Sequence, residues 1–371
     1  MVYGEIKIVK IGIIDADLIA KNKHPFPNLA CMKISGAHKA DGHDVTLLTD
    51  YDSLDNYDSV FLSKVFMNTP VPDWVLQKES VSYGGTGFYF DRAPPLPKNI
   101  EHCFPDYHLY DTWVSQQLSN GGKRRAYRYY TDYSIGFLTR GCFRKCSFCV
   151  NRGYDHVVQH SSLYEFLDND RKRICLLDDN FFGCPEWKSM LELLQSTGKP
   201  FQFRQGLDIR LLDDEKCEML FCSKYDGDYI FAFDDIADTD MIKKKIILTR
   251  KYTAACLKFY TFCGYDRNDR WDESFWIQDI FDLLERIRIL MKYHCIPYIT
   301  RYERYLQSPY RGMYVTIARW VNQPAFYKKR SLREFADMNG IGSSTYRYVH
   351  EFEQKYPQIA PYLDMQYEGG G

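Results

Sequence analysis

The chain has 371 residues, of which 45% are hydrophobic and 26% charged, and its formal net charge is −1 at pH 7. This length allows a sizeable core, and the balanced charge gives no electrostatic reason to expect nucleic acid or an anionic membrane as a partner. The sequence has no run of about 18 apolar residues and no basic-then-apolar leader. We therefore expect a cytoplasmic protein, with no membrane contact, whose twelve cysteines are reduced.

Residues 1–118 are predicted to form a small Rossmann-like domain. A helix is predicted over 27–41, and strands over 6–14, 43–48, 57–62 and 80–84. Because helices and strands alternate, the strands should form a parallel sheet. The last strand ends in Gly84-Gly85-Thr86-Gly87. This turn either brings the backbone close to a ligand or serves only as a tight turn. The domain is abbreviated, since 65–79 leaves little room for a further helix.

Residues 119–133 are predicted to be a linker. A proline-rich stretch at 91–99 precedes it and should end regular structure. Residues 120–130 are basic and aromatic, which leaves two interpretations, a nucleic-acid patch or a solvated loop. The neutral charge of the whole chain favours the solvated loop.

Residues 134–300 show regular alternation. Strands are predicted at 134–139, 173–178, 200–204, 228–233, 257–263 and 295–300, and helices at 161–168, 186–196, 213–223, 240–251 and 274–293. Six such repeats predict an α/β fold, an open (β/α)6 partial TIM-type barrel with its ligands at the carboxyl ends of the strands. Residues 301–371 are predicted to form a helical C-terminal cap.

A cluster of cysteines follows the first strand of these repeats. Cys142, Cys146 and Cys149 have the spacing C-x3-C-x2-C. Thiolates are soft ligands that suit zinc or iron–sulfur clusters. A structural zinc site uses four closed ligands, and only three cysteines are local here. Three thiolates on a four-iron cluster leave one iron open for a small molecule, and we favour that interpretation.

The segment Gly141-Cys142-Phe-Arg-Lys-Cys146-Ser-Phe148-Cys149 resembles the cysteine motif of the radical S-adenosylmethionine (radical SAM) superfamily. The resemblance implies that the three cysteines bind a 4Fe-4S cluster whose open iron binds SAM, with Phe148 at the aromatic position near the adenine. Reductive cleavage of SAM would give a 5′-deoxyadenosyl radical that removes hydrogen from the substrate. An electron donor such as flavodoxin or ferredoxin is implied as a partner.

Polar residues at the next predicted strand ends are candidates for contacts to SAM. They are Asp178, Asp179 and Asn180 after the second strand, Asp208 and Arg210 after the third, and Asp234 and Asp235 after the fourth. The resemblance assigns Asp178, Asp179 and Asn180 to the amino group of SAM. It assigns Arg210 to the SAM carboxylate, because the fork of its guanidinium matches a carboxylate. Asp234 and Asp235 are assigned to the ribose. For each acid the alternative is N-capping of the helix that follows its strand.

Residues 1–118 resemble the cobalamin-binding-like domain of one branch of this superfamily. They contain no Asp-x-His-x-x-Gly motif for a lower cobalt ligand, and we favour an enzyme without cobalamin. The predicted function is a radical SAM enzyme acting on a small polar molecule, such as a modified nucleobase cleaved as in a queuine lyase. The alternatives are a cobalamin-dependent radical SAM methyltransferase and a non-catalytic iron–sulfur or zinc protein.

Overall fold

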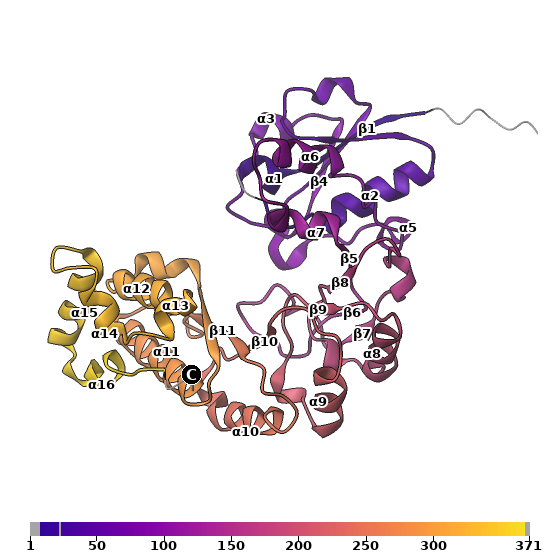
Figure 1. The fold of residues 1–371 in the computed structure, drawn as a ribbon. Coiled ribbons are helices and arrows are strands. Elements are labelled where there is room, and N and C mark those ends of the chain that lie inside the picture. Colours follow the sequence, from indigo (N-terminus) through magenta and orange to yellow (C-terminus); the bar gives the residue numbers. More distant parts are fainter. Residues whose placement is uncertain (1–7, 22–23, 368–371) are drawn as a thin grey trace, which may run out of the picture. The chain divides into compact units, whose positions relative to one another are not determined.

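The computed structural model describes residues 8–21 and 24–367 (Figure 1). The chain divides into two compact units, the first formed by residues 1–178 and 184–202 and the second by 179–183 and 203–371. Residues 6 and 7 of the first predicted strand lie outside the described residues. Each unit is described by itself below.

The first unit begins with a four-stranded parallel sheet in the order β2-β1-β3-β4. Its strands are β1 (Lys10–Asp15), β2 (Asp44–Leu48), β3 (Ser59–Ser63) and β4 (Val81–Gly84). The buried side chains of β1 and β3 form cores on both faces of this sheet. The parallel sheet predicted for this part of the chain is therefore confirmed.

Helices of the first unit cover this sheet. They are α1 (Ala16–Ala20), α2 (Leu29–Ala40), α3 (Asp73–Leu76), α4 (Thr86–Tyr89), α5 (Lys98–Glu101), α6 (Asp111–Ser119) and α7 (Arg128–Thr131). Helix α2 packs against β1, β2, β3 and α5. Asn28 caps α2, because its side chain accepts from the backbone N–H groups of Ala30 and Cys31.

The chain continues with a second sheet in the order β5-β8-β9, in which β5 and β8 are parallel, and with a short antiparallel pair; all of these strands belong to the first unit except the last residue of β9. The strands are β5 (Tyr133–Gly136), β8 (Arg173–Leu176) and β9 (Phe201–Phe203), the antiparallel pair is β6 (Thr139–Arg140) with β7 (Val158–Gln159), and α8 (Trp187–Ser196) precedes β9. Only a short 3-10 turn (Leu163–Glu165) forms where a helix over 161–168 was predicted, so that prediction is wrong. The backbone there bonds elsewhere: the Phe166 carbonyl accepts from the Tyr107 hydroxyl, and the Asp168 N–H donates to the Ser134 hydroxyl.

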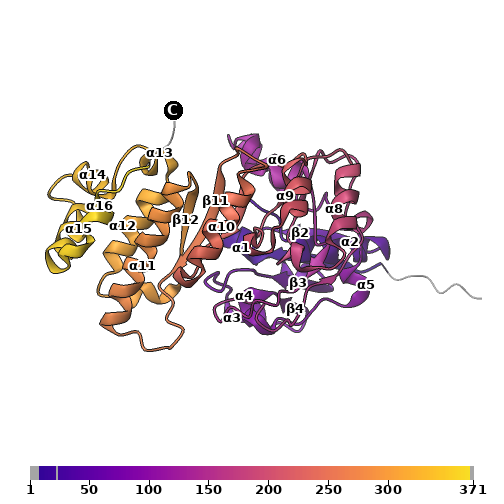
Figure 2. The ribbon, with the colours of Figure 1, turned by 90° about the horizontal axis from the view of Figure 1, so that it is seen from below.

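The second unit contains a three-stranded parallel sheet, β10-β11-β12, backed by helices. Its elements are β10 (Tyr229–Ala232), β11 (Leu257–Cys263), β12 (Ile296–Arg301), α9 (Asp214–Phe221), α10 (Thr239–Thr249), α11 (Glu273–Lys292), α12 (Arg311–Val321), α13 (Pro324–Tyr327), α14 (Leu332–Asp337), α15 (Ser344–Lys355) and α16 (Ala360–Leu363). Helix α11 packs on β11 and β12, α12 packs on β12, and the last helices share one core with them (Figure 2). The predicted helical character of 301–371 is confirmed for its described part.

The molecule is thus a mixed α/β protein with parallel sheets. The six strands predicted from residue 134 on all exist within a few residues of their predicted ends, but they belong to two separate three-stranded sheets. Their arrangement as one partial barrel stays a prediction. Along the described residues, no helix combines the length and the apolar character needed to span a bilayer.

Candidate functional site

The three candidate cysteines lie on a long loop that leaves and re-enters the first unit through the β6–β7 pair. Thr139 pairs with Gln159 and Arg140 with Val158, so the two ends of the loop are held side by side. Gly141 starts the loop with a φ of +97°. A Cβ at this position would stand 2.4 Å from the His156 carbonyl oxygen, so the loop requires glycine here.

Backbone amides of the loop point at two of the three candidate sulfur ligands. The N–H of Arg144 donates to Cys142 Sγ at 3.5 Å, and that of Asn151 donates to Cys149 Sγ at 3.4 Å. A turn closed by Cys149 N–H and the Cys146 carbonyl, at 2.9 Å, joins the second and third cysteines. Amides that donate to a thiolate stabilise its negative charge, and such hydrogen bonds set the potential of iron–sulfur clusters.

This donor set fits a 4Fe-4S cluster. The three cysteines are partly exposed on one loop, so a cluster can reach them. In the described part of the chain no three His, Cys, Asp or Glu side chains have the geometry to hold a single metal ion. A four-iron cluster makes a different demand, since each thiolate binds its own iron.

Asp178 follows β8 and is 1% exposed. Its carboxylate accepts from the N–H of Leu138 at 3.2 Å and from the N–H and hydroxyl of Thr139 at 2.6 and 2.7 Å. These donors belong to the segment that enters the cysteine loop. The structure therefore gives Asp178 a role in holding the loop, which the sequence interpretation as a SAM contact did not foresee.

The neighbouring candidates differ in their exposure. Asn180 is buried, Asp179 is half-buried, and Phe148 is half-buried on the cysteine loop. Phe148 belongs to the first unit, whereas Asp179 and Asn180 belong to the second. Their contact with SAM stays a prediction.

In the second unit, Arg210 lies between two carboxylates. Its Nε is 2.7 Å from Asp208 Oδ1, and one terminal nitrogen is 2.8 Å from Asp238 Oδ2. Asp208 also caps a 3-10 turn by accepting from the N–H of Arg210. The structure thus brings Asp208 and Arg210 together, and it adds Asp238, which sequence reasoning missed.

Asp234 and Asp235 follow β10 and have different surroundings. Asp235 caps a 3-10 turn through the Ala237 N–H and pairs with Arg267 at 2.7 Å, as the capping alternative predicts. Asp234 accepts from the N–H of Phe262 at 2.9 Å. Burial raises the pKa of Asp234, against the lowering effect of that hydrogen bond and of the nearby Arg286.

Arg286 was also missed by sequence reasoning. It lies on the apolar face of α11, is 2% exposed, and donates to the carbonyls of Phe233 and Phe262 at 3.0 and 2.9 Å. These carbonyls lie where β10 and β11 end, so the arginine fixes the two strand ends relative to each other. A charged residue among apolar positions of an amphipathic helix was the available signal.

The carboxyl edge of the N-terminal sheet carries exposed apolar side chains. Val65, Phe66 and Met67, directly after β3, are each at least 50% exposed. The adjoining turn packs beside them, because the Thr86 hydroxyl donates to the Val65 carbonyl. A Cβ at Gly85, where φ is +103°, would stand 2.3 Å from the Lys64 carbonyl oxygen. The glycine-rich turn is therefore needed for the loop after β3 and the loop after β4 to pack together.

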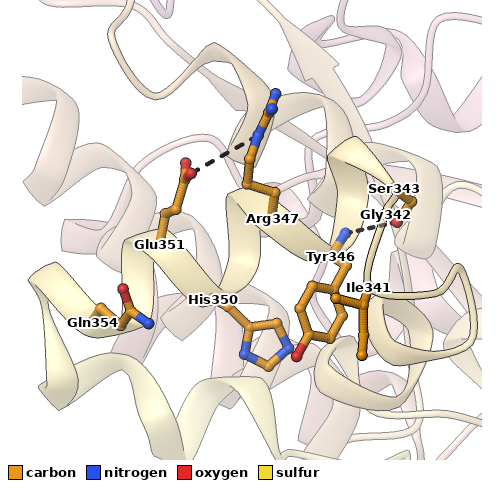
Figure 3. A pocket seen from close by; sticks show the side chains of 8 residues that line it. All are labelled: Ile341, Gly342, Ser343, Tyr346, Arg347, His350, Glu351 and Gln354. Atoms are coloured by element: carbon orange, nitrogen blue, oxygen red, sulfur yellow. Dashed lines mark hydrogen bonds and ion pairs between the residues drawn. The ribbon is translucent and has the colours of Figure 1, made fainter.

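A separate depression lies on α15 and the turn before it and has a volume of about 360 Å3 (Figure 3). Its charged side chains pair locally, Arg347 with Glu351 at 3.9 Å and His350 with Asp337 at 2.9 Å. The Tyr346 and His350 rings are tilted by 37° to each other, with centroids 3.9 Å apart. We place no chemistry in this depression.

Comparison with known proteins adds to this geometry. No family model and no curated protein matches the chain. Among solved structures, it is similar to TsrM, a radical S-adenosylmethionine methyltransferase from Kitasatospora setae determined with cobalamin and a [4Fe-4S] cluster. The TM-score is 0.52 at 11% identity, over 79% of this chain and 75% of TsrM. The chain shares the fold of this enzyme over most of its length.

Two further similarities accompany this one. TsrM with tryptophan and the SAM analogue aza-SAM matches with a TM-score of 0.49 at 9% identity, over 78% of this chain and 72% of TsrM. The cobalamin-dependent radical enzyme OxsB matches with a TM-score of 0.37 at 11% identity, over 94% of this chain and 56% of OxsB. The fold shared with the first of these structures confirms, at the level of the fold, the resemblance drawn from the cysteine motif.

Proposed function

We propose that the protein is a radical SAM methyltransferase of the cobalamin-dependent kind, acting on a small molecule. The observation that carries the proposal is the cysteine loop, with amides directed at its sulfurs, on a fold similar to TsrM. This fold favours the methyltransferase alternative over the cobalamin-free lyase that we expected from the sequence. TsrM itself contains cobalamin as well as the cluster.

Cys142, Cys146 and Cys149 would hold the cluster. When bound, a reduced 4Fe-4S cluster supplies the electron that cleaves a carbon–sulfur bond of SAM, and we propose a flavodoxin- or ferredoxin-like protein as its source. The chain's own contribution is to hold the loop. Gly141 allows the backbone to turn sharply at the start of the loop, and Asp178, directly after Leu177, bonds the segment that precedes the loop.

The remaining candidates are proposed as SAM contacts. We propose that the two three-stranded sheets form one partial barrel over residues 134–300, with 301–371 as its cap, 119–133 as linker and 1–118 as the N-terminal domain. Phe148, Asp179, Asn180, Asp208, Arg210, Asp234 and Asp235 would then face the cofactor. Because Arg210 already pairs with Asp208 and Asp238, a SAM carboxylate would share it with these acids.

The carboxyl edge of the N-terminal sheet offers a surface suited to a corrinoid. A corrin ring is broad and largely apolar, and the exposed side chains of Val65, Phe66 and Met67 present an apolar surface at that edge. Gly84 has open space around it, so a ligand could approach the backbone there. These residues and the turn that follows would hold the cobalamin, and we assign no side chain as its cobalt ligand.

The test is anaerobic purification from cells supplied with cobalamin, followed by reconstitution with iron and sulfide. We expect about four iron atoms per chain, a retained corrinoid, and S-adenosylhomocysteine when SAM, reductant and a methyl-accepting substrate are present. A Cys142→Ala/Cys146→Ala/Cys149→Ala variant is the control and should lose the iron. A reconstituted wild-type protein without iron would overturn the radical SAM assignment. A protein with iron that forms 5′-deoxyadenosine but retains no corrinoid would overturn methyl transfer and restore the lyase interpretation.

A further inference from the structure

The cysteine loop is held from outside at a point between two of its cysteines. Arg152 carries this contact. Its Nε and one terminal nitrogen both lie 2.7 Å from Asp91 Oδ2. Its other terminal nitrogen donates to the Ser147 carbonyl at 3.1 Å, and Ser147 lies between Cys146 and Cys149. One guanidinium therefore connects Asp91 to the loop backbone.

Asp91 belongs to the N-terminal domain rather than to the loop. It follows the glycine-rich turn and α4, in a 3-10 turn that begins at Phe90, whose φ is +50°. A left-handed non-glycine residue is uncommon and costs local energy unless its surroundings fix it. The hydrogen bond from Arg152 holds the pKa of Asp91 below its ordinary value, so its carboxylate is ionised at neutral pH.

A second external contact holds the base of the loop. Glu101, at the end of α5, is 2.8 Å from Lys33 Nζ on α2 and 3.0 Å from His160 Nε2, and Arg140 lies 3.7 Å away. Arg140 is on β6 and His160 directly follows β7, so Glu101 bonds both sides of the loop base. Burial raises the pKa of Glu101, but hydrogen bonds from His160 and Lys33 outweigh it and lower the pKa to about 2.

The contacts of Arg152 and Glu101 affect the proposed cluster because they fix the backbone whose amides face the sulfurs. The Asn151 N–H that donates to Cys149 Sγ belongs to the residue just before Arg152. Each loop residue that is fixed costs about 1–2 kcal/mol of backbone entropy, so a loop with little regular structure needs contacts from outside to keep one conformation. Arg152 provides such a contact next to a sulfur-directed amide, and Glu101 provides another near Cys142.

We propose that the N-terminal domain clamps the cysteine loop through Asp91–Arg152 and Glu101–Arg140, and that Arg152 and Glu101 are positioning residues for the cluster. This inference rests on the proposed function. It gives the N-terminal domain a second role besides any cofactor it binds. A change at the glycine-rich turn would reach the loop through Asp91.

The test compares Arg152→Gln with Lys145→Gln. Lys145 pairs with Asp155 at 2.5 Å, so its substitution removes an ion pair that lies within the loop and leaves the clamp intact. Hydrogen exchange is measured first on the full chain without iron. We expect Arg152→Gln and Glu101→Gln to raise exchange in 142–151 about three- to tenfold, since an ion pair plus a charged hydrogen bond is lost. Lys145→Gln should change it less than twofold.

The second readout is spectroscopic. In reconstituted protein, Arg152→Gln should shift the electron paramagnetic resonance signal of the reduced cluster, Lys145→Gln should leave it in place, and Arg152→Lys should recover part of the shift. Equal exchange in Arg152→Gln and wild type, together with an unshifted signal, would overturn the clamp while leaving the proposed function intact. A wild-type protein that takes up no iron would overturn the proposed function and, with it, the cluster-positioning role, even if the exchange results show the clamp.

Discussion

Replacing Asp178 with alanine should destabilise the segment that leads into the cysteine loop. The carboxylate is 1% exposed and accepts from two backbone N–H groups and the Thr139 hydroxyl. The hydroxyl can rotate to another acceptor, but the two amides cannot. A buried donor left without an acceptor costs about 1–3 kcal/mol, so the free energy of unfolding should fall by about 2–6 kcal/mol. Thr139→Val, which removes only the hydroxyl, should cost about 1 kcal/mol.

Urea unfolding of both variants, followed by circular dichroism, measures this difference. Iron content after anaerobic reconstitution is the second measurement, and it should fall further in Asp178→Ala than in Thr139→Val. An alanine variant that unfolds at the wild-type urea midpoint would refute the loop-holding role. If the variant kept its stability and its iron but lost affinity for SAM, Asp178 would be the cofactor contact that the sequence suggested.

Three further outcomes are expected. Burial raises the pKa of Asp15 to about 7, so the folded chain binds more protons than the unfolded chain between about pH 4 and 7. Its stability should therefore fall by roughly 2–4 kcal/mol as the pH rises through that window, and Asp15→Asn should remove this dependence in pH-dependent urea titrations. Gly141→Ala, which places a Cβ 2.4 Å from the His156 carbonyl oxygen, should lower iron uptake, whereas Gly153→Ala, which has open space, should not. Arg286→Met leaves the Phe233 and Phe262 carbonyls without this donor and should lower the melting temperature, with a cost of about 2–4 kcal/mol.

The order and type of most elements could be predicted from the sequence because apolar residues recur with strand or helix periodicity. The strand over 257–263 was predicted with both ends as observed. Helix α6 was missed, since its segment follows a proline-rich stretch and has little periodicity of its own. It forms because Trp113 and Val114 pack into the core beside β1 and α2, with Tyr107 and Tyr110 from the preceding turn. The basic and aromatic segment 120–130 was expected in solvent, yet Tyr130 is buried and bonds to His24.

The candidate site, too, could be predicted from the sequence only in part. The three cysteines could be found because their ligand spacing is local in the sequence. The acids after each strand could be located but not assigned, because a carboxylate that caps a turn and one that binds a ligand have the same sequence signal. Asp235 caps a turn, whereas Asp178 holds a loop, and only their hydrogen-bond partners distinguish them. Partners such as Asp238 for Arg210 depend on how separate segments pack.

The ligands of the proposed cluster and the forces that fix them come from different parts of the chain. Cys142, Cys146 and Cys149 lie within one loop, but the contacts that hold that loop come from Asp178 after β8 and from Glu101 and Asp91, which precede the loop by at least 40 residues. A peptide with the cysteine motif alone would therefore keep the ligands and lose their arrangement. Because hydrogen bonds to the sulfurs set the potential of such clusters, we expect substitutions at Asp91, Glu101 and Asp178 to change the same electronic signal of the reduced cluster.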